Sequence, residues 1–180
     1  VFRQAKDREL NSFELRFASD WDFPIQALVG VFHQREDRFV RVSIPTTDAN
    51  GEVAANPSIY LDRTVDTEID ETAVFMELSY DFAPNWNLTG GWRWATISID
   101  ELSSAFVNLV AVPGPGAGLP SSFSEEPLIG KVNLNFRPID DALLYAQWSQ
   151  GFRPGGVNDQ TAASLVGATI PAGFGSDSLD

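Results

Sequence analysis

The chain has 180 residues, 43% of them apolar and 12% aromatic, and 12 basic against 25 acidic residues give it a net charge of −13. A surface of this charge repels phosphate backbones, which disfavours nucleic acid as a partner. The sequence has no cysteine, and this excludes disulfides, thiolate metal sites and cysteine nucleophiles.

The first predicted strand follows a polar N-terminal segment. Phe13, Leu15 and Phe17 alternate with Glu14 and Arg16, and a period of two is typical of a half-buried strand. The segment therefore predicts a strand with one apolar and one polar side.

A second strand is predicted over about residues 25–35, after a tight joint at 20–24. Both of its sides are fairly apolar, so its orientation is taken from its neighbour. Pairing with the first strand across the joint puts Ala27, Val29 and Val31 on the outer side.

Two longer strands are predicted over 71–82 and 86–99, joined at 83–85. Along each of them apolar residues occupy one side and polar residues the other. Pairing the strands around Asn85 places Glu77 opposite Arg93, where a cross-strand ion pair contributes about 0.2 to 1 kcal/mol. This pair is predicted to set the register of the two strands more than their stability.

The last two predicted strands lie over about 131–136 and 142–152 and are joined at 137–141. Both alternate in the same way, and helical periodicity is found nowhere in the chain. About six strands are thus expected in total.

The connections between these strands alternate in length. Tight joints at 20–24, 83–85 and 137–141 are separated by the long stretches 36–70, 100–126 and 152–180. If successive strands run up and down, the tight turns share one rim and the long loops the other, which is the layout of an outer-membrane β-barrel. The expected fold is all-β, an antiparallel up-and-down meander of about six strands within a large transmembrane β-barrel. No apolar run reaches about 18 residues, so a transmembrane helix is not expected.

Aromatic residues gather beside the tight joints. They are Phe17, Trp21, Phe23, Tyr80, Phe82, Trp86 and Phe136. Trp92 and Trp94 lie six and eight residues beyond Trp86, and eight tilted residues climb roughly 19 Å. This rise is close to the roughly 25 Å apolar band that aromatic girdles flank in such barrels.

The apolar side of the last four strands is therefore predicted to face lipid. The residues on this side are Val74, Met76, Leu78, Tyr80, Trp92, Trp94, Val132, Leu134, Phe136, Leu144 and Trp148. In a soluble protein the same residues would pack into a core instead.

Three tracts carry a family resemblance. They are ELRFASD at 14–20 with VGVFHQRED at 29–37, ETAVFMELSYDFAPNWNLTGGWRW at 71–94, and GKVNLNFRPIDDALLYAQWSQGFRPGGVN at 130–158. The chain over about 12–158 resembles the β-barrel region of TonB-dependent outer-membrane receptors. The most specific part is YAQWSQGFRPGGVN at 145–158, which looks like the family's YasyskGFRPGGfN stretch. The tract GWRW at 91–94 looks like its G-x-R-Y strand, with Trp94 in place of tyrosine.

The resemblance implies a receptor in the bacterial outer membrane that binds a scarce nutrient outside the cell. The nutrient is most often a ferric siderophore, and otherwise haem, cobalamin or a glycan. Energy comes from the TonB, ExbB and ExbD complex, which acts on an N-terminal plug domain. The lipid of the outer membrane is the other expected partner, and no cofactor is expected.

The 180 residues contain neither that plug nor the aromatic-terminated strand that closes such barrels. Residues 1–180 are therefore expected to be part of a barrel domain. Plugged barrels of this kind need about 22 strands, so about six strands are not expected to close or to transport by themselves.

Substrate contacts in such receptors come from external loops and the upper wall of the lumen, together with the plug. On this analogy the candidates for facing the substrate are Arg93, Gln147, Ser149 and Arg153, with the loops around 39–60 and 106–123. None of these residues belongs to a motif that singles it out.

Residues that could support an enzyme are scarce. Asp140 and Asp141 are neighbours on an extended chain and point apart, so they suit a turn better than acid–base catalysis. His33 is the sole histidine, which rules out a multi-histidine metal site. The GPGAG run at 114–118 lacks the lysine and hydroxyl of a phosphate-binding loop and suggests a loop tip. No catalytic residue and no metal site are therefore assigned, and the protein is not expected to be an enzyme.

Two other interpretations stay open from the residues alone. A soluble β-sandwich that binds a ligand shows the same alternation, but it joins its strands in Greek-key order. A passive outer-membrane porin shares the barrel but has no plug domain upstream.

Overall fold

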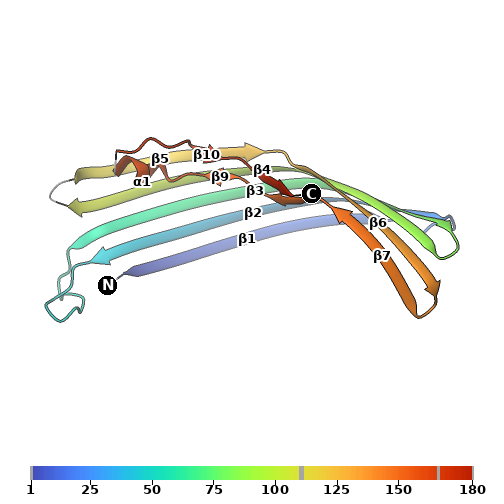
Figure 1. The fold of residues 1–180 in the computed structure, drawn as a ribbon. Coiled ribbons are helices and arrows are strands. Elements are labelled where there is room, and N and C mark those ends of the chain that lie inside the picture. Colours follow the sequence, from blue (N-terminus) through green and yellow to red (C-terminus); the bar gives the residue numbers. More distant parts are fainter. Residues whose placement is uncertain (1, 110–111, 166, 180) are drawn as a thin grey trace.

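The computed structural model describes residues 2–109, 112–165 and 167–179, and most of them form long antiparallel strands in one curved sheet (Figure 1). The strands of this sheet are β1 Arg3–Ala18, β2 Ile25–Pro45, β3 Ile59–Ala83, β4 Trp86–Leu109, β5 Val112–Glu125, β6 Leu128–Ile139 and β7 Ala142–Ser149. Their order is β1-β2-β3-β4-β6-β7, with β5 also paired to β4. Every neighbour pair is antiparallel, so the predicted up-and-down meander is confirmed.

The strands β5 and β6 form one continuous path along β4. Glu125 lies opposite Ile97 and Leu128 lies opposite Trp94, so the register is the same on both sides of the break. Pro127 causes the break, because proline has no N–H to donate to the ladder. Its carbonyl still accepts a hydrogen bond from the N–H of Ala95 at 3.0 Å. The sheet therefore has six strand paths, as the alternation predicted.

After β7 the chain leaves the large sheet. It forms β8 Gly151–Arg153, β9 Gly156–Val157, helix α1 Gln160–Leu165, β10 Gly173–Phe174 and β11 Asp177–Leu179. These short strands pair as β8 with β11 and β9 with β10. We call residues 151–179 the C-terminal segment. Helix α1 has six residues, which is too short to show a helical period, so the described residues remain nearly all-β.

The C-terminal segment packs on one face of the sheet. Phe152 lies against the small buried cluster of Ala73, Ala95 and Ile97. Farther along, the hydroxyl of Thr161 donates a hydrogen bond to the carbonyl of Ser103 at 2.7 Å, and Thr161 is fully buried. These contacts fix the segment to β3 and β4. The described residues contain no helix of the length and apolarity that a membrane crossing requires.

The strands are much longer than the sequence predicted. Most of the stretch 36–70 belongs to β2 and β3, and their connection is 46–58. Most of 100–126 belongs to β4 and β5, which pair with each other, and residues 110–111 between them lie outside the described residues. The run at 114–118 is therefore strand and not a loop tip.

The tight joints lie together at one end of the sheet, as Figure 1 shows. The connection 46–58 and the paired ends of β4 and β5 lie at the other end. The predicted separation of tight turns and long connections onto two rims is thus correct, although the long connections are largely strand.

The predicted pairing of Glu77 with Arg93 is wrong by two residues. Arg93 lies opposite Phe75, and Glu77 lies opposite Gly91. One residue of this shift comes from the turn, where Ala83 pairs with Trp86 so that the turn is not centred on Asn85. The other comes from one extra residue of β3 beside the turn, because Tyr80 pairs with Leu88. A shift of two residues keeps every side chain on its own face, so the assignment of faces survives the error.

Gly30 on β2 is a position where only a glycine fits. A Cβ added there would lie 2.9 Å from the carbonyl oxygen of Leu15 and would also overlap the ring of Phe75. Gly90 on β4 is its natural control, because an added Cβ there meets nothing within 4 Å.

We predict that Gly30→Ala destabilises the full-length protein by about 1–3 kcal/mol, the usual cost of overpacking. Gly90→Ala should be neutral or stabilising by about 0.4–1 kcal/mol, because alanine restricts the unfolded chain. Urea unfolding midpoints measure both changes. Equal midpoints for the two variants would show that β1 and β2 do not approach as closely as described.

Candidate functional site

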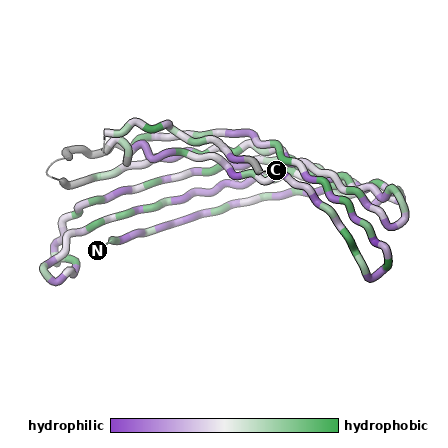
Figure 2. The backbone as a smooth tube through the Cα atoms, viewed as in Figure 1, coloured by the Kyte–Doolittle hydropathy of each residue, from purple (hydrophilic) through white to green (hydrophobic). Residues whose placement is uncertain are grey.

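The sheet has two chemically different faces at the end with the tight turns. The apolar residues predicted to face lipid share one of them, because the register pairs Val74 with Trp94, Met76 with Trp92 and Val132 with Trp148. We call this the apolar face and the opposite one the polar face. Figure 2 shows hydrophobic and hydrophilic positions alternating along β6 and β7.

The side chains on the apolar face are open to the surroundings. Seven of the predicted residues are between 40% and 62% exposed, namely Leu78, Tyr80, Trp92, Trp94, Val132, Leu144 and Trp148. The other four are half-buried, namely Val74, Met76, Leu134 and Phe136. The C-terminal segment lies on the polar face, so it does not cover them. An apolar surface of this extent indicates contact with another apolar phase or partner.

The apolar face ends abruptly along the strands. In the row beyond Val74 and Trp94, it presents His33 of β2 hydrogen-bonded to Thr72 of β3, with Nδ1 and Oγ1 3.1 Å apart. The next row holds Arg35 and Asp70, and charges continue from there. The apolar band is therefore limited to the half of the sheet next to the tight turns.

Aromatic rings form a contiguous chain at the tight-turn end of this band. The ring centroids of Tyr80 and Phe82 are 6.2 Å apart, those of Phe82 and Trp86 are 6.0 Å apart, and Trp86 stacks on Phe136 at 4.3 Å. These separations suit favourable aromatic pairs. The rings border the apolar band on the side of the turns.

On the polar face, four cations each have a carboxylate of their own. The Nη2 atom of Arg93 lies 2.5 Å from Glu71, and Nζ of Lys131 lies 2.5 Å from Glu77. Two further pairs are Arg16 with Glu14 and Arg63 with Asp159. This face is thus polar but locally neutral over most of its area.

The structure brings together three of the four residues predicted to face substrate. Arg93, Gln147 and Ser149 lie on the polar face, where Gln147 is opposite Asn133 and Ser149 is opposite Lys131. The guanidinium of Arg93 also lies 5.0 Å from the ring centroid of Phe32. Arg153 does not join them, because it belongs to β8 in the C-terminal segment and pairs with Asp177.

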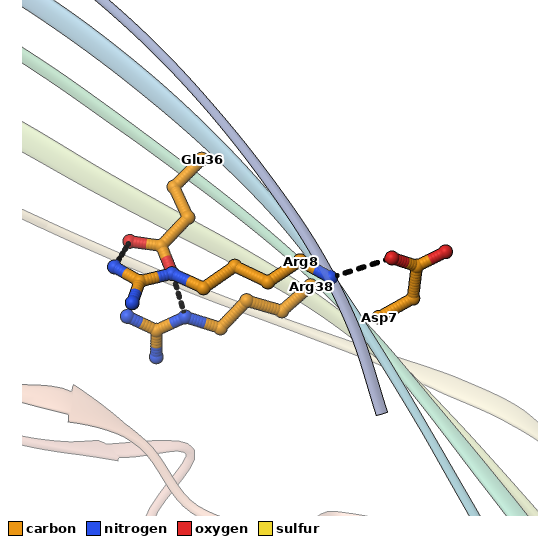
Figure 3. Close-up of polar contacts among 4 residues, drawn as sticks. All are labelled: Asp7, Arg8, Glu36 and Arg38. Carbon is orange, nitrogen blue, oxygen red and sulfur yellow. Dashed lines mark hydrogen bonds and ion pairs between the residues drawn. The ribbon is translucent and has the colours of Figure 1, made fainter. Parts of the chain in front are cut away.

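A charged cluster that the sequence analysis missed lies on the polar face of β1 and β2. Glu36 is only 2% exposed, and both Arg8 and Arg38 bind its carboxylate (Figure 3). Arg8 reaches Oε1 through Nε at 2.5 Å and Oε2 through Nη2 at 3.0 Å, and Arg38 donates to Oε1 through Nε. The sequence carries a signal, since Glu36 and Arg38 are two residues apart on one strand. From the sequence, residue 36 is assigned to a long connection, where a spacing of two residues does not indicate a shared face.

The arginines shift the acidity of Glu36 strongly. The hydrogen bond from Arg38 lowers the pKa of Glu36 most, burial opposes the shift, and Arg8 lowers the pKa further, to about 2. Glu36 in turn raises the pKa of Arg38. The cluster borders a hollow of about 820 Å³, whose lining includes Arg8, Arg38, Thr67, Glu101 and Ser121. Burial, followed by the nearby Asp159, raises the pKa of Glu101.

The polar face has the chemistry of a surface that binds polar groups. Within the described ranges, no group of three histidines or carboxylates is placed to hold a metal ion. The arrangement offers fixed charges, amides and hydroxyls to a polar partner or ligand.

Comparisons with known proteins point in one direction. The family model of the TonB dependent receptor-like β-barrel matches residues 2–178. No curated protein matches the chain.

Solved structures of three receptors share the fold. The ferric yersiniabactin uptake receptor FyuA from Yersinia pestis is similar over 98% of this chain and 25% of its own, with 16% identity and a TM-score of 0.74. The ferric citrate transporter FecA in its unliganded form matches 84% of this chain and 21% of its own, with 16% identity and a TM-score of 0.58. The siderophore receptor PiuA from Acinetobacter baumannii matches 84% of this chain and 24% of its own, with 15% identity and a TM-score of 0.54. This chain thus spans about a quarter of the length of these structures.

The lowered pKa of Glu36 gives a pH-dependent prediction. Because this pKa falls from 4.5 to about 2 on folding, the ionised carboxylate stabilises the folded state fully above about pH 4.5, and the stabilisation is lost as the pH falls towards about 2. The stability difference between wild type and Glu36→Gln should therefore be largest above about pH 4.5 and shrink below it. Urea unfolding between pH 2 and 6 measures this difference. A difference that is constant over this range would contradict the ion pairs.

Proposed function

This chain belongs to the TonB-dependent receptor-like β-barrel family, and on that premise we propose that it forms part of the wall of a bacterial outer-membrane receptor that imports a ferric siderophore with energy from the TonB complex. The structural neighbours are uptake receptors and transporters. Neither they nor the family are enzymes, in line with the expectation from the sequence.

The observation that carries the proposal is the exposed apolar band. In a soluble sandwich, Leu78, Trp92 and Val132 would lie between two sheets, whereas each is more than 40% exposed. In a bilayer, strands survive because their backbone groups pair with neighbouring strands, while their side chains solvate in hydrocarbon. We therefore propose that all the residues predicted to face lipid contact the outer membrane, with the ring chain from Tyr80 to Phe136 at the interface beside the tight turns.

The sheet alone is too small to enclose a lumen. Within the part of the chain that the structure describes, strands β1 and β7 each have a neighbour on one side only, and plugged barrels of this type have about 22 strands. We propose that other strands of the receptor pair with these two edges. Residues 1–180 would then be one part of the barrel domain, and a plug domain elsewhere in the receptor would contact TonB, itself driven by ExbB and ExbD.

The polar face suits the lumen of such a receptor. Four of its cations are paired with carboxylates, which reduces the number of charges left unpaired where it lies against a folded plug. Arg93, Gln147 and Ser149 share this face, and we propose that they line the lumen. Arg153 would approach the substrate from the C-terminal segment.

Energy-dependent uptake is the decisive test of function. Cells that carry the full-length receptor, grown under iron limitation, should accumulate radioactive iron from a panel of ferric siderophores. Accumulation should stop when tonB is deleted, with the receptor still present in the outer-membrane fraction. Uptake that persists without TonB would favour a passive porin, and recovery of the protein in the soluble fraction would favour a soluble binding module.

A pair of arginine substitutions tests the lipid-facing assignment. Leu78→Arg places a charge in the apolar band and should destabilise the folded barrel by about 2 kcal/mol, because charges on the lipid face cost about 2–4 kcal/mol at mid-membrane and less towards the interfaces. Tyr145→Arg is the control, since Tyr145 is 71% exposed and lies on the polar face opposite Asn135. Unfolding of the full-length receptor in lipid bilayers measures both. Equal losses for the two variants would refute the assignment of faces.

A further inference from the structure

We propose that Arg8 and Arg38, held side by side by Glu36, form a binding site for a negatively charged group of the imported metal chelate. The inference rests on the proposed function and adds to it the charge class of the substrate and the residues that select it. The group recognised would be a carboxylate or another anion with two or more oxygens, because a guanidinium binds such groups through parallel hydrogen bonds.

The first argument is an imbalance of charge. Arg8 and Arg38 lie directly opposite each other on β1 and β2, and like charges in this position destabilise a sheet. Other cations on the polar face, such as Arg93 and Lys131, each have a carboxylate of their own. Here, among the residues that the structure describes, two arginines share the carboxylate of Glu36.

The neighbouring position adds to this excess. Lys6 lies two residues before Arg8, on the same side of β1 and opposite Val40 of β2. The cluster of Lys6, Arg8, Arg38 and Glu36 thus carries a net charge of about +2 by formal count, on a chain whose total is −13. A charge of this sign in an acidic protein gives an anionic ligand a local reason to bind.

The second argument is the way the carboxylate is used. Glu36 is buried, whereas the side chains of Arg8 and Arg38 are 59% and 46% exposed. Arg38 bonds through Nε, which leaves its two Nη groups able to donate to a ligand. Figure 3 shows the two guanidinium groups together on the same side of the carboxylate. Glu36 is thus a positioning residue that fixes the two guanidiniums in place.

The third argument is location. The register places Arg8, Arg38, Thr67, Glu101 and Ser121 in one row across the polar face. They lie along a hollow of about 820 Å³, within the usual range for small-molecule sites. The row lies beyond the apolar band, on the half of the sheet away from the tight turns. The carboxylate of Glu101 lies in the half of this row away from the arginines, next to Ser121, so an anion is directed to the β1 and β2 side.

Binding to the purified full-length receptor tests the inference. Quenching of tryptophan fluorescence would be titrated with ferric citrate, an anionic chelate, and with an uncharged ferric trihydroxamate. Arg8→Gln and Arg38→Gln should each weaken binding of ferric citrate about tenfold, and the double variant about a hundredfold, as expected for charge-assisted hydrogen bonds. Binding of the uncharged chelate should change less than about twofold, within the scatter of surface substitutions.

Arg41→Gln is the matched control. Arg41 is similarly exposed, at 53%, and is also paired with a carboxylate, that of Asp62. It lies on the opposite face from Arg38, three residues along β2, and its loss should leave both affinities unchanged. Arg8→Lys with Arg38→Lys keeps the charge without the fork and should fall between wild type and the double glutamine variant. Heat-induced unfolding shows that each variant is folded.

The outcomes separate this inference from the proposed function. If wild type and the double glutamine variant bind ferric citrate equally, or if wild type binds the uncharged chelate alone, the anion site is refuted while the receptor function stands. If wild type binds none of a wider panel of ferric chelates, the siderophore function fails, and the site fails with it. Glu36→Gln should also weaken binding of ferric citrate although it removes a negative charge. An unchanged or tighter affinity would refute its positioning role.

Discussion

The structure depends on the unbroken pairing of backbone groups along strands of up to 25 residues. In hydrocarbon an unpaired N–H or C=O costs several kcal/mol, so the ladder must be complete wherever lipid surrounds it. Once it is complete, each residue's face is decided by whether its position is odd or even. The same pairing that satisfies the backbone thus separates a surface for lipid from a surface for the lumen.

This dependence on parity explains which predictions succeeded. Alternation in the strands around Leu78, Trp92 and Val132 identified both faces, because one side there is apolar and the other polar. The register itself was not predictable, since the extra residue of β3 beside Asn85 leaves no mark in the hydrophobic pattern. Arg93, Gln147 and Ser149 could be placed on one face by parity alone. Arg153 could not, because the chain leaves the sheet before it.

The long outer halves of the strands escaped prediction for a different reason. Beyond His33 and Thr72 charged residues replace the apolar ones on one side of the sheet, and apolar residues such as Val40 and Ile69 appear on the other. The alternation near the tight turns is therefore not continued, although the strands continue. Pairing there is supported by ions across strands, such as Arg41, which binds both carboxylate oxygens of Asp62 at 2.9 and 2.6 Å. This contact lowers the pKa of Asp62. The excess of acidic residues thus lies largely in sheet and not in solvated loops.

The cluster around Glu36 differs from these ion pairs in the arrangement of its charges. A register held by cross-strand charges works best when opposite signs face each other. On the apolar face's side of the sheet, Arg35 lies opposite Asp70, and Arg41 binds Asp62 diagonally across the same two strands. Arg8 opposite Arg38 breaks this rule on the side that we assign to the lumen. No single stretch of sequence reveals the exception, because Arg8 and Glu36 are 28 residues apart and meet only through the β1 and β2 register. Arg8 and Arg38 thus break a rule of sheet stability on the face where a ligand would pass. Such exceptions are expected at functional sites, so function accounts for these two residues better than stability does.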